Sequence, residues 1–129
     1  MRHEFPGQFD CSIEYNEALA HQLYAGSDFL LMPSRVEPCG LNQLYALRYG
    51  TVPIVRSVGG LMDTIIDISE EDGRGVRFNR FNISAAFTAL QRAVDLYQNQ
   101  KAFKALVAKN MQLDFSWEKS ARTYAAIYT

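Results

Sequence analysis

The stretch PSRVEPCGLNQLYALRYGTVPIVRSVGG, residues 33–60, decides which fold the sequence predicts. An apolar run at 28–32 comes before it and is typical of a buried strand. A polar loop follows at 34–38, then a helix at about 39–49 and a second buried strand at 52–55. Strand, loop, helix and strand in this order form the building block of an open parallel sheet. Ligands of such sheets bind outside the carboxyl ends of the strands, which is where this loop is expected.

The loop carries groups suited to a polar or anionic ligand. Glu37 supplies a carboxylate, and Gly40 stands where the helix begins, so that backbone and ligand can approach closely. A helix N-terminus has free N–H groups and a partial positive charge, which suit a phosphate. The residues alone leave alternatives open: Glu37 as a loop acid that caps the helix, and Gly40 as an ordinary turn glycine.

The rest of the chain predicts one α/β domain over residues 1–129, with the sheet region at 1–80 and terminal helices at 82–129. The strand at 28–32 is expected to be central in the sheet. In the sheet region, the other predicted elements are a strand at 8–15, a helix at 17–25 capped by Asn16, a flexible turn at 57–60, a helical turn at 61–66 and a strand at 75–78. Three terminal helices are predicted after them. The first is capped by Asn82, the second lies at about 101–111, and the third is capped by Ser116.

Composition excludes several classes of protein. Thirteen basic and fourteen acidic residues give a net charge of −1, which does not indicate binding to nucleic acid or to an anionic membrane. Cys11 and Cys39 lie in unrelated segments without metal-ligand spacing, so neither a metal site nor a disulfide is expected. No apolar run approaches the ~20 residues of a membrane span. A cytoplasmic protein is therefore expected.

Three segments resemble the donor-sugar region of bacterial and plant glycogen and starch synthases. They are SIEYNEALAHQLYAGSDFLLMPSR at 12–35, EPCGLNQLYALRYGTVPIVRSVGGLMDT at 37–64 and DFSWEKSARTYAAIY at 114–128. The resemblance covers nearly the whole chain. It implies a Rossmann-like parallel sheet flanked by helices, as part of the C-terminal domain of a retaining GT-B glucosyltransferase, with a helical segment at the C-terminus.

The resemblance also implies roles for particular residues. Glu37 matches the family's acid that binds the donor glucose near its anomeric carbon, and it is the catalytic candidate. Substrate-binding roles fall on Cys39, Gly40, Leu41 and Asn42, beside the sugar and distal phosphate of ADP-glucose. Tyr45 stands where related transferases often have a second acid, as is common in the glycogen and starch synthase branch. No metal and no cofactor are expected.

Tyr15 matches an aromatic residue that stacks on adenine in the family. We expect it at the end of the first strand, at the same sheet edge as Glu37. The alternative is an aromatic side chain that packs on the helix at Leu19. His21, inside that helix, is assigned no chemistry.

The implied activity is transfer of glucose from ADP-glucose to the non-reducing end of an α-1,4-glucan with retention. In the family, an Arg and a Lys in a segment of the pattern Ser-Arg-x-x-x-x-Lys-Gly meet the charge of the diphosphate. No such segment precedes Tyr15 in this sequence. The chain is therefore expected to be a C-terminal portion that is inactive alone. Alternatives are a non-catalytic module that binds a nucleotide sugar or dimerises, and a GT-B transferase with another donor such as UDP-glucose. Uncovered surfaces favour homo-oligomers.

Overall fold

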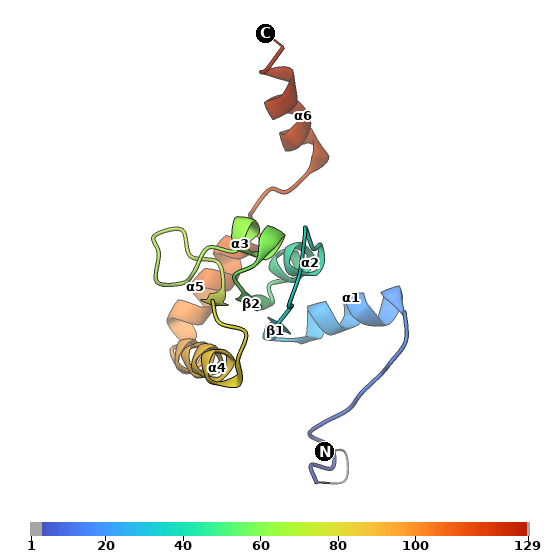
Figure 1. The fold of residues 1–129 in the computed structure, drawn as a ribbon, viewed down its shortest axis with the longest axis vertical. Helices are drawn as coiled ribbons and strands as arrows, with labels where there is room; N and C mark the ends of the chain where they lie inside the picture. The colour runs from blue at the N-terminus through green and yellow to red at the C-terminus, as the bar shows by residue number, and fades with distance from the viewer. Residues whose placement is uncertain (1–3, 129) are drawn as a thin grey trace.

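The computed structural model describes residues 4–128 and shows a three-stranded parallel sheet with helices on both faces (Figure 1). The predicted α/β class is therefore confirmed. In chain order the elements are α1 (Glu17–Gly26), β1 (Phe29–Met32), α2 (Asn42–Tyr49), β2 (Val52–Arg56), α3 (Gly59–Thr64), β3 (Val76–Phe78), α4 (Ile83–Gln98), α5 (Gln100–Asn110) and α6 (Trp117–Ala125).

The strands lie in the order β1-β2-β3, so β2 is the middle strand. Ile54 of β2 is in register with Leu31 on one side and with Val76 on the other. The first four residues of β2 are buried, because helices cover both faces of the sheet. This explains why β2 has an uninterrupted apolar sequence rather than an alternating one.

Two apolar clusters, one on each face of the sheet, form the core. The first joins β1 and β2 to α2 and α3 through Met32, Leu47, Val55, Leu61 and Ile65. The second joins β2 and β3 to α4 through Ile54, Val76, Phe78, Ala89 and Ala93. Small alanines on α4 let this helix approach the sheet closely. The three layers fix the position of the loops at the carboxyl end of the sheet.

The predicted helix caps are confirmed. The side chain of Asn16 accepts a hydrogen bond from the N–H of Leu19 at 3.0 Å. Asn82 and Ser116 make the same contact at the starts of α4 and α6. Each bond satisfies one of the N–H groups that a helix leaves free at its start.

The strand predicted at residues 8–15 is wrong. Residues 9–13 have no regular secondary structure, and the side chains of 9–15 are exposed. The N–H of Cys11 bonds to the Asp10 carboxylate, so local contacts replace a strand ladder there. Alternation of apolar and polar residues makes a strand only where a neighbouring strand accepts its hydrogen bonds, and β1 pairs with β2 alone among the described strands.

Two further expectations need correction. β1 is an edge strand rather than the central one, since no strand from residues 8–15 pairs with its outer side. Leu31 of β1 is accordingly 43% exposed. The predicted flexible turn at 57–60 is also wrong in its second half, because Gly59 and Gly60 are the first two residues of α3.

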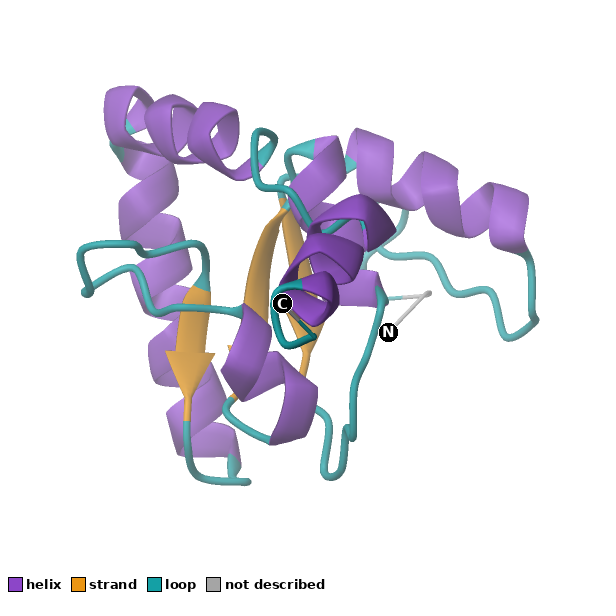
Figure 2. Cartoon of the chain, turned by 90° about the horizontal axis from the view of Figure 1, so that it is seen from above, coloured by secondary structure: helices purple, strands orange, loops and turns teal. Residues whose placement is uncertain are grey.

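The last helix, α6, stands apart from the sheet. Figure 1 shows it beyond the linker that follows α5, and Figure 2 shows the same molecule from above. None of the α6 residues is buried. Its exposed apolar side chains include Trp117 and Tyr124, so α6 adds little to the core.

Candidate functional site

The candidate site is the turn over residues 37–40, which lies between the carboxyl end of β1 and the start of α2. Arg56, at the end of β2, holds the preceding part of the loop. Its guanidinium donates to the carbonyl oxygens of Ser34 at 3.2 Å and Arg35 at 2.9 Å. The loop that carries Glu37 is therefore anchored to the neighbouring strand.

The turn packs backbone to backbone against the start of α3. The N–H of Gly60 donates to the carbonyl oxygen of Glu37 at 3.1 Å. A Cβ added at Gly59 would lie 2.0 Å from that same oxygen, and one added at Gly60 would lie 1.9 Å from the carbonyl oxygen of Cys39. Both glycines are therefore required for the close approach, whereas the sequence predicted only a flexible turn for them.

A buried side chain, Gln43, fixes the turn from below. It is fully buried, and its Nε2 lies 3.1 Å from the carbonyl oxygen of Cys39 and 2.8 Å from that of Gly40. The same nitrogen lies 3.2 Å from Oγ1 of Thr64 in α3. Thr64 Oγ1 in turn donates to the carbonyl oxygen of Gly60 at 2.6 Å. One amide thus links the turn, α2 and α3.

The start of α2 carries free hydrogen-bond donors. Leu41 is the N-cap residue, and no side chain caps the helix. Within residues 4–128, the backbone N–H groups of Gly40, Leu41, Asn42 and Gln43 have no protein acceptor. Free donors in successive residues at a helix start form a site for an anion. Glu37 therefore does not act as the helix cap, which was one reading of this acid.

Glu37 and Gly40 lie together, as predicted. Cγ of Glu37 is 3.2 Å from the position that a Cβ of Gly40 would occupy. Gly40 has a φ of +77°, a conformation that favours glycine. The Glu37 side chain is half-buried, and within the described residues it has no ion pair. Its carboxylate is therefore free to accept hydrogen bonds from a ligand.

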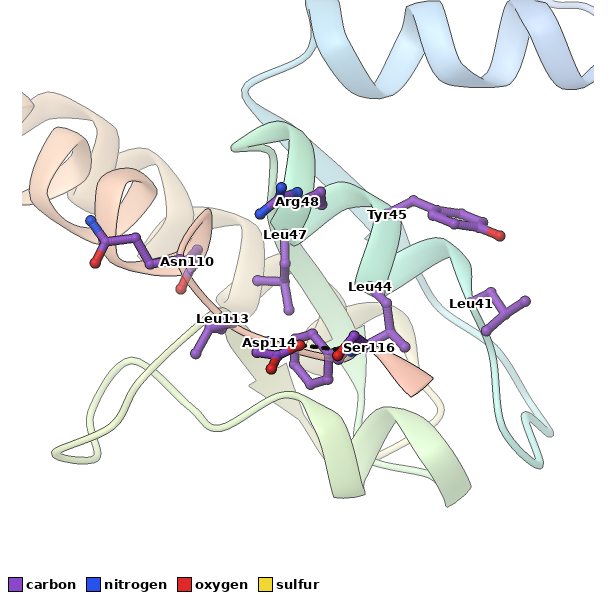
Figure 3. Close-up of a pocket in the computed structure, with 11 residues that line it drawn as sticks. Leu41, Leu44, Tyr45, Leu47, Arg48, Asn110, Leu113, Asp114 and Ser116 are labelled. Atoms are coloured by element: carbon purple, nitrogen blue, oxygen red, sulfur yellow. Dashed lines mark hydrogen bonds between the residues drawn. The ribbon is translucent and has the colours of Figure 1, made fainter. Parts of the chain in front are cut away.

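Two hollows lie beside α2, and one of them reaches the turn at Cys39. One, of about 510 Å³, lies between α2 and the linker after α5, as Figure 3 shows with Leu44 and Leu113. The second, of about 790 Å³, is bounded by α6 and lined in part by Cys39 and Leu41. Glu37, Gly40 and Asn42 do not line either hollow. Both linings are mainly apolar.

The structure does not bring Tyr15 to this group. Its side chain is 93% exposed in the segment before α1, and it makes no hydrogen bond or ring contact among the described residues. His21, by contrast, has a structural contact. Its Nδ1 lies 3.0 Å from the hydroxyl oxygen of Tyr49, so it joins α1 to α2.

Residues 4–128 contain neither a metal cluster nor a membrane-spanning helix. No set of three or more His, Cys, Asp and Glu side chains in that range is placed to hold a metal ion. No helix in that range has the length and apolar character needed to cross a membrane.

Helices on both faces of a parallel sheet, with an amide-rich turn after a strand, define an α/β protein whose turn has the geometry of an anion site. The chain belongs to the glycosyl transferases group 1 family, whose sequence model matches residues 13–109. The resemblance to glycogen and starch synthases is confirmed by individual relatives.

The chain is 48% identical over 128 residues to a glycogen synthase of Flavobacterium johnsoniae, a match that covers 99% of this chain and 27% of that protein. It is 49% identical over 126 residues to a glycogen synthase of Anaeromyxobacter sp. strain K, covering 97% of this chain and 26% of the relative. The chain thus spans about a quarter of the length of these relatives.

A solved structure gives the same result. The catalytic domain of starch synthase IV from Arabidopsis thaliana, bound to ADP and acarbose, is 40% identical, with a TM-score of 0.83. That match covers 90% of this chain and 25% of the solved chain. A sucrose-phosphate synthase from Thermosynechococcus elongatus is 27% identical, with a TM-score of 0.61, over 81% of this chain and 25% of that one.

Sequence reasoning missed Gln43 and Thr64 as parts of the site. A signal for Gln43 was present, because it shares a helix face with Ala46 and Leu47, which are both buried. A polar residue on the core face of a helix needs a buried partner. Thr64 gave no comparable signal, since its contact with Gln43 depends on how α3 packs on α2.

Proposed function

We propose that this chain is the donor-binding part of a glycosyltransferase that moves glucose from ADP-glucose to the non-reducing end of an α-1,4-glucan with retention. The observation that carries the proposal is the set of N–H groups at the start of α2 that have no acceptor within residues 4–128, next to a Glu37 carboxylate that has no ion pair there. The first suits the diphosphate and the second suits sugar hydroxyl groups. The relatives named glycogen synthase, and the starch synthase bound to ADP, support the choice of donor.

In this proposal Glu37 binds the donor glucose and offsets positive charge that develops on the ring during transfer. Cys39, Gly40, Leu41 and Asn42 bind the sugar and the distal phosphate with their backbone. Tyr45 cannot serve as a second acid, and its ring instead packs near His21 and Tyr24 of α1. Retention therefore does not rest on a pair of carboxylates from this helix.

Tyr15 keeps its proposed role as the surface on which adenine stacks. Its exposed ring is accessible to a flat base. In this arrangement the segment before α1 has to bring the ring to the turn when the nucleotide binds. Calorimetry with ADP tests this role: Tyr15→Ala should weaken binding by about tenfold, because stacking on an aromatic ring is worth ~1–3 kcal/mol per base. Unchanged affinity would remove Tyr15 from the site.

The experiment that tests the whole proposal compares ADP with ADP-glucose as ligands of the chain. Glu37→Gln should weaken ADP-glucose binding about tenfold and leave ADP binding unchanged, because the carboxylate contacts the sugar alone. Glu118→Gln, an exposed acid on α6, is the matched control and should change neither affinity. If the unmodified chain binds neither ligand, or if Glu37→Gln weakens both equally, the proposal fails. Stronger binding of UDP-glucose than of ADP-glucose would mean that the donor is UDP-glucose rather than ADP-glucose.

A further inference from the structure

Gln43 is a fully buried side chain at the second residue of α2, where its amide reaches the turn and α3. We propose that Gln43 is a positioning residue. It holds the carbonyl groups of Cys39 and Gly40 inward, aims the N–H groups of Gly40 and Leu41 outward, and so sets the affinity of the turn for a nucleoside diphosphate. The role in affinity rests on the proposed function, whereas the orientation of the turn does not.

The hydrogen bonds fix which end of the Gln43 amide faces the turn. The carbonyl oxygens of Cys39 and Gly40 only accept. Thr64 Oγ1 already donates its proton to the carbonyl oxygen of Gly60, so toward Gln43 it also accepts. Three acceptors surround one end of the amide, so this end has to be the NH₂ group, whose two N–H donors are shared among them. A glutamate of the same shape would place an oxygen against three oxygens.

The geometry of the peptide bond transmits this contact to the ligand side. In a trans peptide the carbonyl of one residue and the N–H of the next point in opposite directions. The described chain has no cis peptide. Holding the carbonyls of Cys39 and Gly40 against Gln43 therefore turns the N–H groups of Gly40 and Leu41 away from it. These are N–H groups that no protein acceptor satisfies in the described residues.

The two ends of the Gln43 amide have opposite effects on stability. Oε1 of Gln43 is buried, and within the described residues it has no hydrogen-bond partner. It lies 2.7 Å from the position of a Cβ on Gly40, where the positive φ already favours glycine. A buried acceptor without a partner opposes folding, whereas the hydrogen bonds from Nε2 to the turn favour it, and an apolar side chain of the same size would lose both. What the glutamine gains over such a side chain is control of the two carbonyl groups.

The test compares Gln43→Met with Asn110→Leu in the 129-residue chain. Both variants replace a buried carboxamide with an apolar group of similar size. Asn110 resembles Gln43 in having a bonded Nδ2, which donates to the carbonyl of Arg74 at 2.7 Å, and an unpartnered Oδ1, but it lies away from the turn. Amide NMR spectra of the free protein and an ADP titration are recorded for each variant.

In the free protein, Gln43→Met should shift the amide signals of Gly40 and Leu41 and speed hydrogen exchange at Gly60, whose N–H bonds to Glu37. Affinity for ADP should fall about tenfold, the scale of one lost charge-assisted contact. Asn110→Leu should change neither. Thr64→Val removes one of the three acceptors and should give a smaller effect in the same direction, which keeps the test valid if Gln43→Met fails to fold.

Failure of the proposed function and failure of the positioning role of Gln43 give different results. If the unmodified chain does not bind ADP, the proposed function fails, and the spectra of the free protein still decide whether Gln43 orients the turn. If the unmodified chain binds ADP and Gln43→Met leaves both the turn signals and the affinity unchanged, the positioning role is overturned and the proposed function stands. Equal loss of affinity in Asn110→Leu would show a general effect of destabilisation and would also overturn the role.

Discussion

At the residue scale, glycines decide whether the site can form. Gly60 has no side chain because the carbonyl oxygen of Cys39 occupies the place where a Cβ would lie. Gly40 combines a positive φ with a close contact to the Gln43 amide. Gly26 differs from both, since nothing lies within 4 Å of a Cβ added there. Close packing therefore requires glycine at position 60, whereas it does not require glycine at position 26.

This contrast predicts opposite effects of alanine. Gly60→Ala should lower the free energy of unfolding by about 2–3 kcal/mol, because two backbones must separate to admit the methyl group. Gly26→Ala, at the last residue of α1, should be neutral or stabilise by up to ~1 kcal/mol, because alanine favours a helix. Urea unfolding of the two variants checks this. Equal effects in both would mean that the contact between Gly60 and Cys39 does not constrain the fold.

Asp67 is the acid that joins the loop before β3 to α4. Its carboxylate accepts from Arg92 at 2.5 Å, from the N–H of Arg77 at 2.7 Å and from Oγ of Ser69 at 2.7 Å. Burial raises the pKa of Asp67, but the hydrogen bonds from Arg92, Ser69 and Arg77 outweigh burial and hold the pKa well below its ordinary value of 3.8. The folded state therefore favours the charged form.

A pKa that is lowered by folding adds stability above the ordinary value, and that stability is lost as the pH falls below it toward the folded-state pKa. Asp67→Asn should lower the free energy of unfolding by about 2 kcal/mol at pH 7. In this variant the free energy of unfolding should also fall less steeply as the pH drops below about 4 than it does in the unmodified chain. Asp95→Asn, an exposed acid on α4, is the control and should keep the wild-type pH profile. Denaturant unfolding between pH 2 and 7 measures both effects, and an unchanged acid limb in Asp67→Asn would contradict this reading.

At the scale of elements, α2 contributes to both the core and the site. Leu47 is fully buried against Val55 and Leu61, while Asn42 and Gln43 open the same helix at the turn. The register of α2 on the sheet therefore sets the position of its free N–H groups. Any change that lets the helix slide also moves the candidate site.

Leu47→Ala should therefore lower the free energy of unfolding by about 2–5 kcal/mol, because it leaves a cavity between α2 and the sheet. Leu23→Ala, at a position on α1 that is 57% exposed, should cost less than about 1 kcal/mol. Thermal or denaturant unfolding gives both values. A small effect of Leu47→Ala would mean that α2 is held mainly by its contacts at the turn.

At the scale of the whole molecule, apolar surface is left uncovered in two places. In α6, Trp117 is 85% and Tyr124 65% exposed, and Ile127, just after the helix, is 73% exposed. The outer side of β1 pairs with no strand in the described part of the chain. Exposed apolar helices and unpaired strand edges both favour association with another chain.

We therefore expect the chain to self-associate, and we expect α6 to contribute. Ending the chain after Ser116 should change the free energy of unfolding by less than about 1 kcal/mol, since α6 has no buried residue. The same truncation should shift the protein toward monomer in sedimentation velocity. A 129-residue chain that stays monomeric at high concentration would contradict self-association. Unfolding of the shortened chain would contradict the small contribution of α6 to stability.

Local patterns in the sequence were sufficient to predict the unit from β1 to β2, three of the four side-chain helix caps in residues 4–128 and the closeness of Glu37 to Gly40. Each depends on residues near one another in the chain: an apolar run, a capping side chain, a turn of a few residues. The roles of Glu37 and its neighbours came from the resemblance to glycogen and starch synthases and remain proposals.

Tertiary structure alone decided which strand is central, whether residues 8–15 form a strand, and what Gln43 and Gly60 contact. A strand exists only where another backbone accepts its hydrogen bonds, and alternation in one segment does not supply that partner. Gln43 contacts Thr64, and Gly60 packs against Cys39. Both partners lie more than fifteen residues away in the chain. Such contacts form when elements pack, so no local pattern specifies them.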